Sequence, residues 1–332
     1  MINPGLNKYD VILADKHYLR ELVESITLDD SIDEIAYRGT IQMVVTGDFP
    51  GISPGQAIRV SGVPFGGSKM AYLLHPAVVW DINSVLRGQK RLTAVTYDPS
   101  IYMARSEDEY LFPAGQTAAQ RLEKYASDWE IPLAKVEDTG IQLSKAVYRA
   151  QPIYNMLMSD LRETVSKGGS VFLPRMTPGG LSLIKLGSNK TVWALETGQS
   201  VEEVSQRRTM EGAVTQVKVL GAAEKEGRSP VLALEKGETE GLGTLQRVLQ
   251  DPDITSTGAA KKAASEMLAG VQQTISVSGI DINTIRAGDK VQLDGWNLFV
   301  FSVRHELGSP GHMSLELADE AYIRRSFYGR PF

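Results

Sequence analysis

The chain contains no cysteine among its 332 residues, and only four of them are histidine. The absence of thiols excludes disulfides, thiolate metal sites and cysteine nucleophiles. No apolar run approaches the ~20 residues that a membrane-spanning helix needs. The N-terminus also lacks the basic region and apolar core of a signal peptide. We therefore expect a protein made in a reducing cytoplasm, with no membrane partner.

A strong excess of either sign of charge is also missing. The chain has 35 Lys and Arg against 40 Asp and Glu, which gives a net charge of −5 spread over small clusters. A groove that binds nucleic acid would need a basic stripe with interleaved aromatic residues, and none is visible. A mildly acidic surface instead lets a polyanion pass without sticking.

The hydrophobic content of 42% and the charged content of 23% are those of a folded protein. A chain of this length is expected to hold two to three domains.

A short motif occurs twice. Ile52–Val63 matches Ile285–Trp296 with a constant offset of 233, as in 288 − 55. In each copy a glycine (Gly55, Gly288) precedes a strand with alternating apolar residues, and a second glycine (Gly62, Gly295) closes it. The pattern indicates a duplicated β-module, and duplication of a shape favours assembly over catalysis.

The first 96 residues read mostly as strand. The segment 35–45 is rich in strand formers, with Gly39 expected to mark a bulge or bend. Residues 79–85 and 91–97 are expected to form a hairpin. The Gly-rich segment Val63–Lys69 occurs in the first copy only, so the two copies are expected to contact their neighbours differently.

The middle of the chain reads as α+β. Thr117 and Gln120 form a capping-box pattern that predicts a helix with Leu122, Tyr125, Ala126 and Trp129 on one face. A second amphipathic helix is predicted over 153–165, followed by a hairpin of 170–173 and 181–186.

From about residue 200 the β character returns. Strands are predicted over 213–220, 231–235 and 274–277, with a charged loop at 224–228 and a helix over 259–268.

No catalytic, cofactor-binding or metal-binding residues emerge from the chain. His305 and His312 bracket a turn and could form half of a metal site, but two polar residues at a hairpin mouth are favoured, and His17 and His75 lie apart. The segment Gly62–Lys69 departs from the phosphate-binding loop pattern. The carboxylate pairs Glu107/Glu109 and Glu238/Glu240 occupy polar stretches where solvated charge is expected. The remaining candidates, expected to pack in cores, are Trp80, Trp129, Trp193 and Trp296.

One segment resembles a binding module. Tyr110–Leu122, which contains Gly115-Gln-Thr117, and the following helix are similar to a LysM module in the order of strand, Gly-x-Thr helix start and amphipathic helix, although its second strand is poorly defined. That resemblance implies peptidoglycan binding or a purely structural use of the same small fold.

The order of segments resembles the baseplate hub proteins of contractile phage tails, particularly the XkdQ-like hubs of PBSX-type prophages. The stretches that carry this resemblance are Tyr97–Phe112 with the LysM-like helix, Glu211–Val219 with Gly241–Gln246, and the ending from Gly288 to Leu317. The resemblance implies a non-enzymatic homotrimer without cofactors in the tail baseplate of a virion. Its three chains would place six tube-like modules in a ring that joins the sixfold tail tube to the threefold central spike and surrounds the channel for DNA and the tape measure. The implied partners are the tail tube, spike, tape measure and wedge or outer hub proteins.

We therefore expect an α+β, mainly β fold with two tail-tube-like β-barrel modules flanking a smaller, partly LysM-like α+β region. The expected domains are 1–96 (first barrel module), 97–146 (LysM-like), 147–200 (helix plus hairpin) and 201–332 (second barrel module). The alternative hypotheses are a peptidoglycan-binding or cell-wall-degrading tail protein and, more weakly, a cargo of an injection system. The type of particle, whether phage, bacteriocin-like tail or another injection system, stays open.

Overall fold

The computed structural model describes residues 4–222, 229–251 and 254–329, so the predicted charged loop at 224–228 lies outside the described residues. The chain divides into two compact units, one formed by residues 1–205 and 276–332 and the other by residues 206–275. The fold is α+β and mainly β, and a 13-stranded sheet dominates the part of the chain that is described. Its path, β14-β18-β21-β20-β3-β4-β7-β6-β5-β1-β2, has two ends, so the pairings among these strands close no barrel.

The first half of this sheet comes from the N-terminal part of the chain. After the 3₁₀ turn Pro4–Leu6, its elements are β1 (Tyr9–Leu13), β2 (His17–Tyr18), the 3₁₀ turn Arg20–Leu22, β3 (Val23–Ser31), β4 (Arg38–Val44), β5 (Ala57–Gly62), β6 (Ala71–Arg87) and β7 (Gln89–Tyr97). The predicted hairpin of 79–85 and 91–97 is confirmed, since β6 pairs antiparallel with β7. Alternate apolar side chains of these strands face one buried core.

The second half comes from the C-terminal part. Its strands are β13 (Trp193–Leu195), β14 (Val201–Thr209), β18 (Gln272–Ile280), β19 (Lys290–Leu293), β20 (Trp296–Leu307) and β21 (His312–Ala318). The helix α5 (Glu320–Tyr328) follows β21, with Asp319 as its N-cap.

The two halves have the same strand order. The run β3-β4-β7-β6-β5 in the first corresponds to β14-β18-β21-β20 with β19 in the second. The partners Val79↔Thr96 of β6 and β7 correspond to Val300↔Leu317 of β20 and β21 with an offset of 221, as in 300 − 79. Both hairpins also shift register one residue later, at Trp80 in β6 and at Phe301 in β20. A shared bulge at the same place indicates one duplicated module, since bulges are specific features of a fold.

The connections differ as the sequence predicts. The strands β19 and β20 are joined by Asp294 and Gly295, which both have positive φ, as a two-residue hairpin turn requires. The strands β5 and β6 are joined through the longer Gly-rich segment Val63–Lys69, which confirms the insertion in the first copy. Both second glycines close a strand as predicted, but Gly62 is the last paired residue of β5, whereas Gly295 lies in the turn after β19.

The bulge or bend expected at Gly39 is absent. This glycine lies in a regular part of β4. A Cβ at this position would meet Thr96 Oγ1 at 2.6 Å and Leu74 Cδ2 at 2.7 Å. The glycine is needed because core side chains pack directly over its backbone.

Between the two halves lies an α+β region. Its elements are α1 (Ile101–Arg105), β8 (Glu107–Phe112), α2 (Ala118–Asp128), β9 (Leu133–Val136), β10 (Ala146–Pro152), α3 (Ile153–Ser166), β11 (Phe172–Thr177) and β12 (Gly180–Lys185). The capping box of Thr117 and Gln120 is confirmed. The second predicted helix is α3, and the predicted hairpin is β11 with β12. The strand that was poorly defined in the sequence is β10, which pairs with β8.

The second unit, residues 206–275, begins within β14 and ends within β18. Its sheet has the order β16-β15-β17, formed by β15 (Gln216–Leu220), β16 (Val231–Lys236) and β17 (Gln246–Gln250). The helix α4 (Thr257–Met267) packs on this sheet through Ala260 and Ala264.

Candidate functional site: the junction between the two β-modules

The repeated turn has the same hydrogen bonds in both modules. In each copy the glycine amide donates to the carbonyl of a valine in the second strand after it (β6 or β20), and the amide of that valine donates back to the carbonyl of the residue after the glycine. The bonds are Gly55 N to Val79 O (2.8 Å) and Val79 N to Gln56 O (2.9 Å), then Gly288 N to Val300 O (2.7 Å) and Val300 N to Asp289 O (2.9 Å). Both glycines have φ of +88°, which favours glycine.

A side chain closes each turn in the same way. The Gln56 Oε1 accepts from the amide of Ser53 at 2.8 Å, and Asp289 Oδ2 accepts from the amide of Arg286 at 2.9 Å. The weak sequence repeat is therefore a repeat of backbone geometry, with glutamine and aspartate as interchangeable acceptors.

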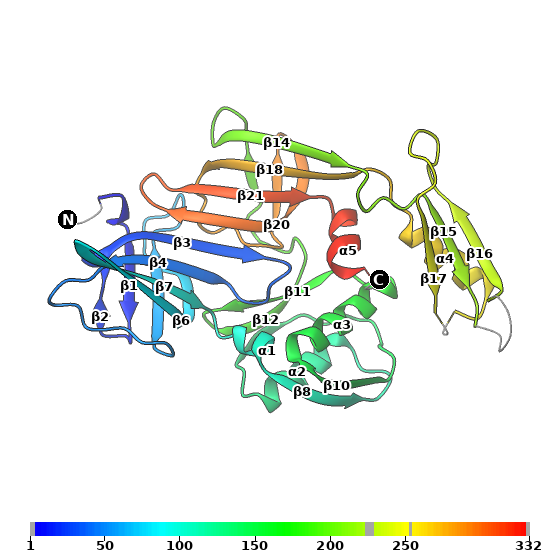
Figure 1. Cartoon of the computed structure of the whole chain (residues 1–332), viewed down its shortest axis with the longest axis horizontal. Coiled ribbons are helices and arrows are strands. Elements are labelled where there is room, and N and C mark those ends of the chain that lie inside the picture. The colour runs from blue at the N-terminus through cyan, green and yellow to red at the C-terminus, as the bar shows by residue number, and fades with distance from the viewer. Residues whose placement is uncertain (1–3, 223–228, 252–253, 330–332) are drawn as a thin grey trace. The chain divides into compact units, whose positions relative to one another are not determined.

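The modules meet where β3 of the first pairs with β20 of the second. The antiparallel partners run from Ser302↔Ser31 to Leu307↔Ile26. In Figure 1 these two strands lie side by side in the middle of the large sheet. The junction is thus a continuation of the sheet, which fixes the two modules through backbone hydrogen bonds.

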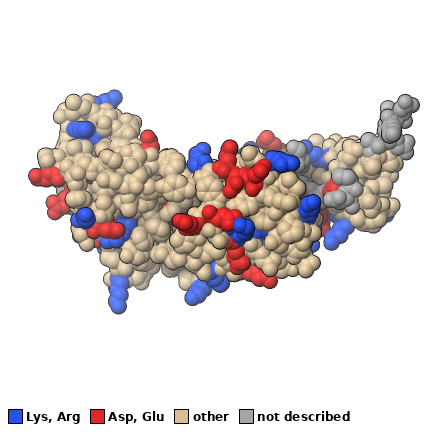
Figure 2. All heavy atoms as spheres, turned by 90° about the horizontal axis from the view of Figure 1, so that it is seen from below, with Lys and Arg blue, Asp and Glu red and all other residues tan. Residues whose placement is uncertain are grey.

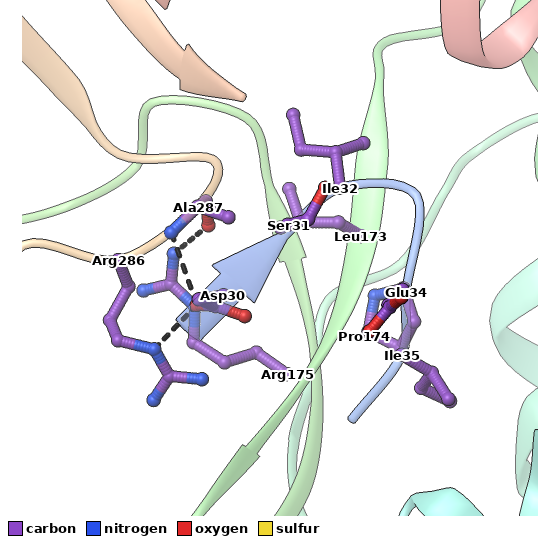
Figure 3. Close-up of a pocket in the computed structure, with 10 residues that line it drawn as sticks. All are labelled: Asp30, Ser31, Ile32, Glu34, Ile35, Leu173, Pro174, Arg175, Arg286 and Ala287. Carbon is purple, nitrogen blue, oxygen red and sulfur yellow. Dashed lines mark hydrogen bonds and ion pairs between the residues drawn. The ribbon is translucent and has the colours of Figure 1, made fainter. Parts of the chain in front are cut away.

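The turn of the second module is bound by Asp30 at the end of β3. Asp30 Oδ2 accepts from Arg286 Nε at 2.5 Å and from the amide of Ala287 at 3.1 Å (Figure 3). The Arg286 guanidinium lies over the Tyr37 ring, 3.6 Å from its centroid. A charge-assisted bond, a backbone bond and a cation–π contact therefore converge on this turn.

A third segment, strand β11 of the middle region, reaches the same turn. Arg175 Nη2 donates to Asp289 Oδ1 at 2.8 Å and to the Ala287 carbonyl at 2.5 Å. Asp30, Arg175 and Arg286, drawn in Figure 3, line a hollow. Its volume is about 10 Å³, close to that needed for one water molecule. This hollow is too small for a ligand larger than water, but a second hollow of about 190 Å³ borders the junction, with Tyr37, Asp98, Arg175 and Arg286 in its lining.

Asp98 supports the junction from the first module. Its carboxylate accepts from the amides of Tyr37 and Ser100, both at 2.9 Å, and from the Ser100 hydroxyl. Burial raises the pKa of Asp98 to about 6, although these hydrogen bonds and Arg286 act in the opposite direction. Burial also raises the pKa of Tyr37. For Arg286, burial lowers the pKa, but Asp30 and Tyr37 raise it more, so the net shift is upward and the guanidinium keeps its charge.

The histidines do not come together. His305 is buried, with Nδ1 at 2.6 Å from Asp281 Oδ1 and Nε2 at 2.8 Å from the Ile285 carbonyl. His305 pairs with Met313 across the hairpin, so His312 lies one position along and faces the opposite side of the sheet, where it is exposed. Sequence reasoning found the turn between these residues but missed Asp281, which lies 24 positions away.

Most of the tryptophan side chains are exposed, so the expectation that they pack in cores is wrong for them. Trp296 is 70% exposed, and Trp80 and Trp129 are both 37% exposed. Trp80 lies at the bulge of β6, where it makes T-shaped ring contacts with Tyr97 and Tyr102. These residues lie at a bulge, a helix end and a hairpin, where the side chain leaves the buried face. The carboxylate pairs Glu107/Glu109 and Glu238/Glu240 are exposed, as expected.

A buried polar cluster in the middle region was not predicted. Arg121 Nη1 and Asp160 Oδ1 are 2.6 Å apart with both side chains fully buried. The hydroxyls of Tyr125 and Tyr148 also donate to Asp160. Burial raises the pKa of Asp160, against the opposing effects of Tyr148 and Arg121. The cluster joins α2, β10 and α3, and Tyr148 is its partly exposed member.

Within the described ranges, no three His, Asp or Glu side chains are placed to hold a metal ion, and no helix has the length and apolar character to cross a membrane. On the face drawn in Figure 2, acidic and basic side chains are interspersed with uncharged ones.

A duplicated β-module with a fused sheet defines a fold that occurs in tail proteins. The model of the YqbQ-like family matches residues 77–318, and the chain belongs to this family. It is 24% identical over 202 residues to the uncharacterized protein YqbQ of Bacillus subtilis, covering 59% of this chain and 61% of YqbQ. It is 27% identical over 122 residues to the PBSX phage-like element protein XkdQ of the same organism, covering 36% of this chain and 37% of XkdQ. The chain thus matches less than two thirds of either relative, and the resemblance to XkdQ-like proteins is confirmed.

Solved structures share the fold. The 43 kDa tail protein of prophage MuSo2 from Shewanella oneidensis matches with a TM-score of 0.73 and 11% identity, covering 95% of this chain and 99% of that protein. The E. coli c3393 protein, described as a type VI secretion component similar to the phage T4 tail proteins gp27 and gp5, matches with a TM-score of 0.55 and 9% identity, covering 90% of this chain and 74% of that protein.

Proposed function

We propose that the chain is a non-enzymatic structural subunit of a tail baseplate hub, in a phage or a related injection particle. The observation that carries the proposal is the duplicated module: two copies with equal strand order and equal turns share one sheet, held by the junction around Asp30 and Arg286. The tail-protein fold of its structural neighbours supports the same role.

In this proposal three chains form a ring. Two modules per chain would then supply six similar docking surfaces, which suits a hub between a sixfold tail tube and a threefold spike. The remaining proposed partners are the tape measure protein in the channel and the wedge or outer hub proteins around it, with DNA in transit. The four-part division at residues 96, 146 and 200 is part of the proposal, and we add that the channel lining is neutral or acidic, so that DNA passes without sticking.

Imaging of purified particles tests the hub proposal. Electron microscopy is expected to show three copies of the chain around an open axial channel, between tube and spike. One copy per particle, or a peripheral location, would contradict it. A monomer in isolation is compatible, because assembly can depend on the partners.

The alternative is peptidoglycan binding by the LysM-like segment. The strand–helix–strand order of β8, α2 and β10 favours it, and so do two opposed apolar side chains, Leu111 at 67% and Val147 at 53% exposure. Pull-down on purified peptidoglycan, compared between the natural chain and Leu111→Ser, tests it. Retention of the natural chain and loss of the variant would support cell-wall binding, while no retention and no muropeptide release would discard it.

A further inference from the structure

Two of the edges of the large sheet have equivalents in the other module and have no partner strand within the described chain. One is the second part of β6, Asp81–Arg87, which pairs with β7 on one side and, in the described chain, with no strand on the other. The other is the outer edge of β14, which ends the large sheet. Unpaired backbone amides and carbonyls on such edges are templates for a further strand.

The β6 edge has an equivalent that is occupied. With the offset of 221, Asp81–Leu86 of β6 corresponds to Ser302–Leu307 of β20. In β20 that stretch is paired with β3 of the first module. The difference shows in burial, since Leu307 is 6% exposed and its counterpart Leu86 is 76% exposed.

Strand β14 is the counterpart of β3, the strand that pairs with this stretch of β20. Both β3 and β14 have nine residues and pair with equivalent strands, β4 and β18. Their sequences match as Val23-Glu-Ser-Ile-Thr27 and Val201-Glu-Glu-Val-Ser205, with an offset of 178 (201 − 23). Ile26 is 2% exposed, whereas its counterpart Val204 is 40% exposed.

We infer that β14 of one copy of the chain pairs antiparallel with Asp81–Arg87 of β6 in the next copy. This contact repeats between chains the pairing of β3 with β20 inside each chain. Since Ile26 is the partner of Leu307 and Thr27 that of Glu306, the inferred partners are Val204 with Leu86 and Ser205 with Val85.

The inferred contact is head-to-tail. Each chain offers one β14 edge and one β6 edge, so the contact uses different surfaces on its two sides and generates a ring when the rotation closes. The inference rests on the proposed ring of three chains and specifies which strands join them. It also accounts for the exposed apolar side chains on both edges, which the ring would bury.

Because the chain has no cysteine, introduced cysteines are the only thiols that it contributes to a disulfide test. In particles assembled from the chain with Leu86→Cys and Val204→Cys, mild oxidation is expected to link neighbouring copies, up to a covalent three-chain species on a non-reducing gel. Each single variant, and Leu86→Cys combined with Gln206→Cys, which is out of register by two residues, are the controls and are expected to link weakly or not at all.

The outcomes separate this inference from the hub proposal. Three copies in a ring by electron microscopy, with no link between positions 86 and 204 or with stronger linking in the out-of-register control, would overturn the strand pairing and leave the hub proposal standing. A link from position 86 to a different tail protein would also overturn it. A particle without three copies would overturn the hub proposal itself.

If the double variant does not assemble, the single variants provide a second measurement. Thiol labelling at Leu86→Cys and at Val204→Cys is expected to be fast in the isolated chain and lost in particles. Equal labelling in both states would contradict the inference.

Discussion

The two glycine turns have the same backbone hydrogen bonds, but the turn at Gly55 is exposed and the turn at Gly288 is buried. Around Gly55, residues 53–55 are exposed, whereas Ala287, Gly288 and Asp289 are buried. The first turn ends in solvent, while the second is held by Asp30 from the other module and Arg175 from the middle region. Local sequence therefore specifies the turn, and the neighbouring segments decide whether it becomes a junction.

The difference has a direct energetic consequence. Changes at the second turn disturb three chain segments at once, whereas the same changes at the first turn act on local geometry alone. Matched substitutions in the two copies measure what the junction adds to stability.

The largest effect is expected for Asp30→Ala. It leaves the Arg286 guanidinium, whose side chain is only 18% exposed, without its carboxylate, and removal of one partner of a buried pair costs about 3–5 kcal/mol. The neighbouring Asp29→Ala is the control, because the ion pair of Asp29 with Arg304 is exposed and such pairs contribute about 0–1 kcal/mol. Urea unfolding of both variants gives the comparison, and equal losses would show that the junction is not a special site.

The matched glycine pair comes next. An alanine Cβ at position 288 would meet Leu173 Cδ1 at 2.5 Å, but at position 55 it would meet nothing within 4 Å. Gly55→Ala therefore carries only the cost of positive φ, about 1 kcal/mol, while Gly288→Ala adds overpacking and reaches about 2–4 kcal/mol. Thermal unfolding measures both, and a Gly55→Ala loss as large as that of Gly288→Ala would contradict the burial difference.

The elements that were predicted correctly are those whose determinants are local. The helix α2 begins where Thr117 and Gln120 cap each other three residues apart, and the strand β19 ends just before Gly295, where the sequence places a closing glycine. The repeat itself was visible because a glycine at fixed offset keeps its backbone role.

The junction could not be predicted, because Asp30 and Arg286 are 256 positions apart and neither stands in a recognisable motif. Gly39 was misread for a similar reason: its role depends on Leu74 and Thr96, which reach it only in the folded sheet. The tryptophans were misread because apolar periodicity does not reveal a bulge such as that at Trp80.

The pH dependence sharpens the comparison at another matched position. Asp98 after β7 corresponds to Asp319 after β21 with the offset of 221 (319 − 98), and only Asp98 is buried. The pKa of Asp98 rises from 3.8 to about 6 on folding because the carboxyl is buried, so the native state binds this proton more tightly than the unfolded state. The contribution of Asp98 to stability is then greatest below pH 4 and falls as the pH rises to about 6.

Replacement of Asp98 by asparagine is expected to remove that dependence. The difference in unfolding free energy between the natural chain and Asp98→Asn should change by about 1–3 kcal/mol between pH 4 and 6.5, in the direction of a less stable natural chain at higher pH. Urea unfolding across this range measures it, with Asp319→Asn as the matched control. A difference that stays constant with pH would show that Asp98 titrates alike in both states.

The smallest effect is expected at the exposed turn. Gln56→Ala removes the acceptor for the Ser53 amide, but water can replace it at this surface, so the loss should be about 0.5–1 kcal/mol. Gln56→Asp imports the acceptor that the second copy has at Asp289, and it should restore most of this loss because the shorter side chain already closes the same turn there. Chemical unfolding of the two variants side by side measures the difference. If Gln56→Asp is no more stable than Gln56→Ala, the two turns share their backbone hydrogen bonds but not an interchangeable side-chain acceptor. The duplication then concerns the backbone geometry alone.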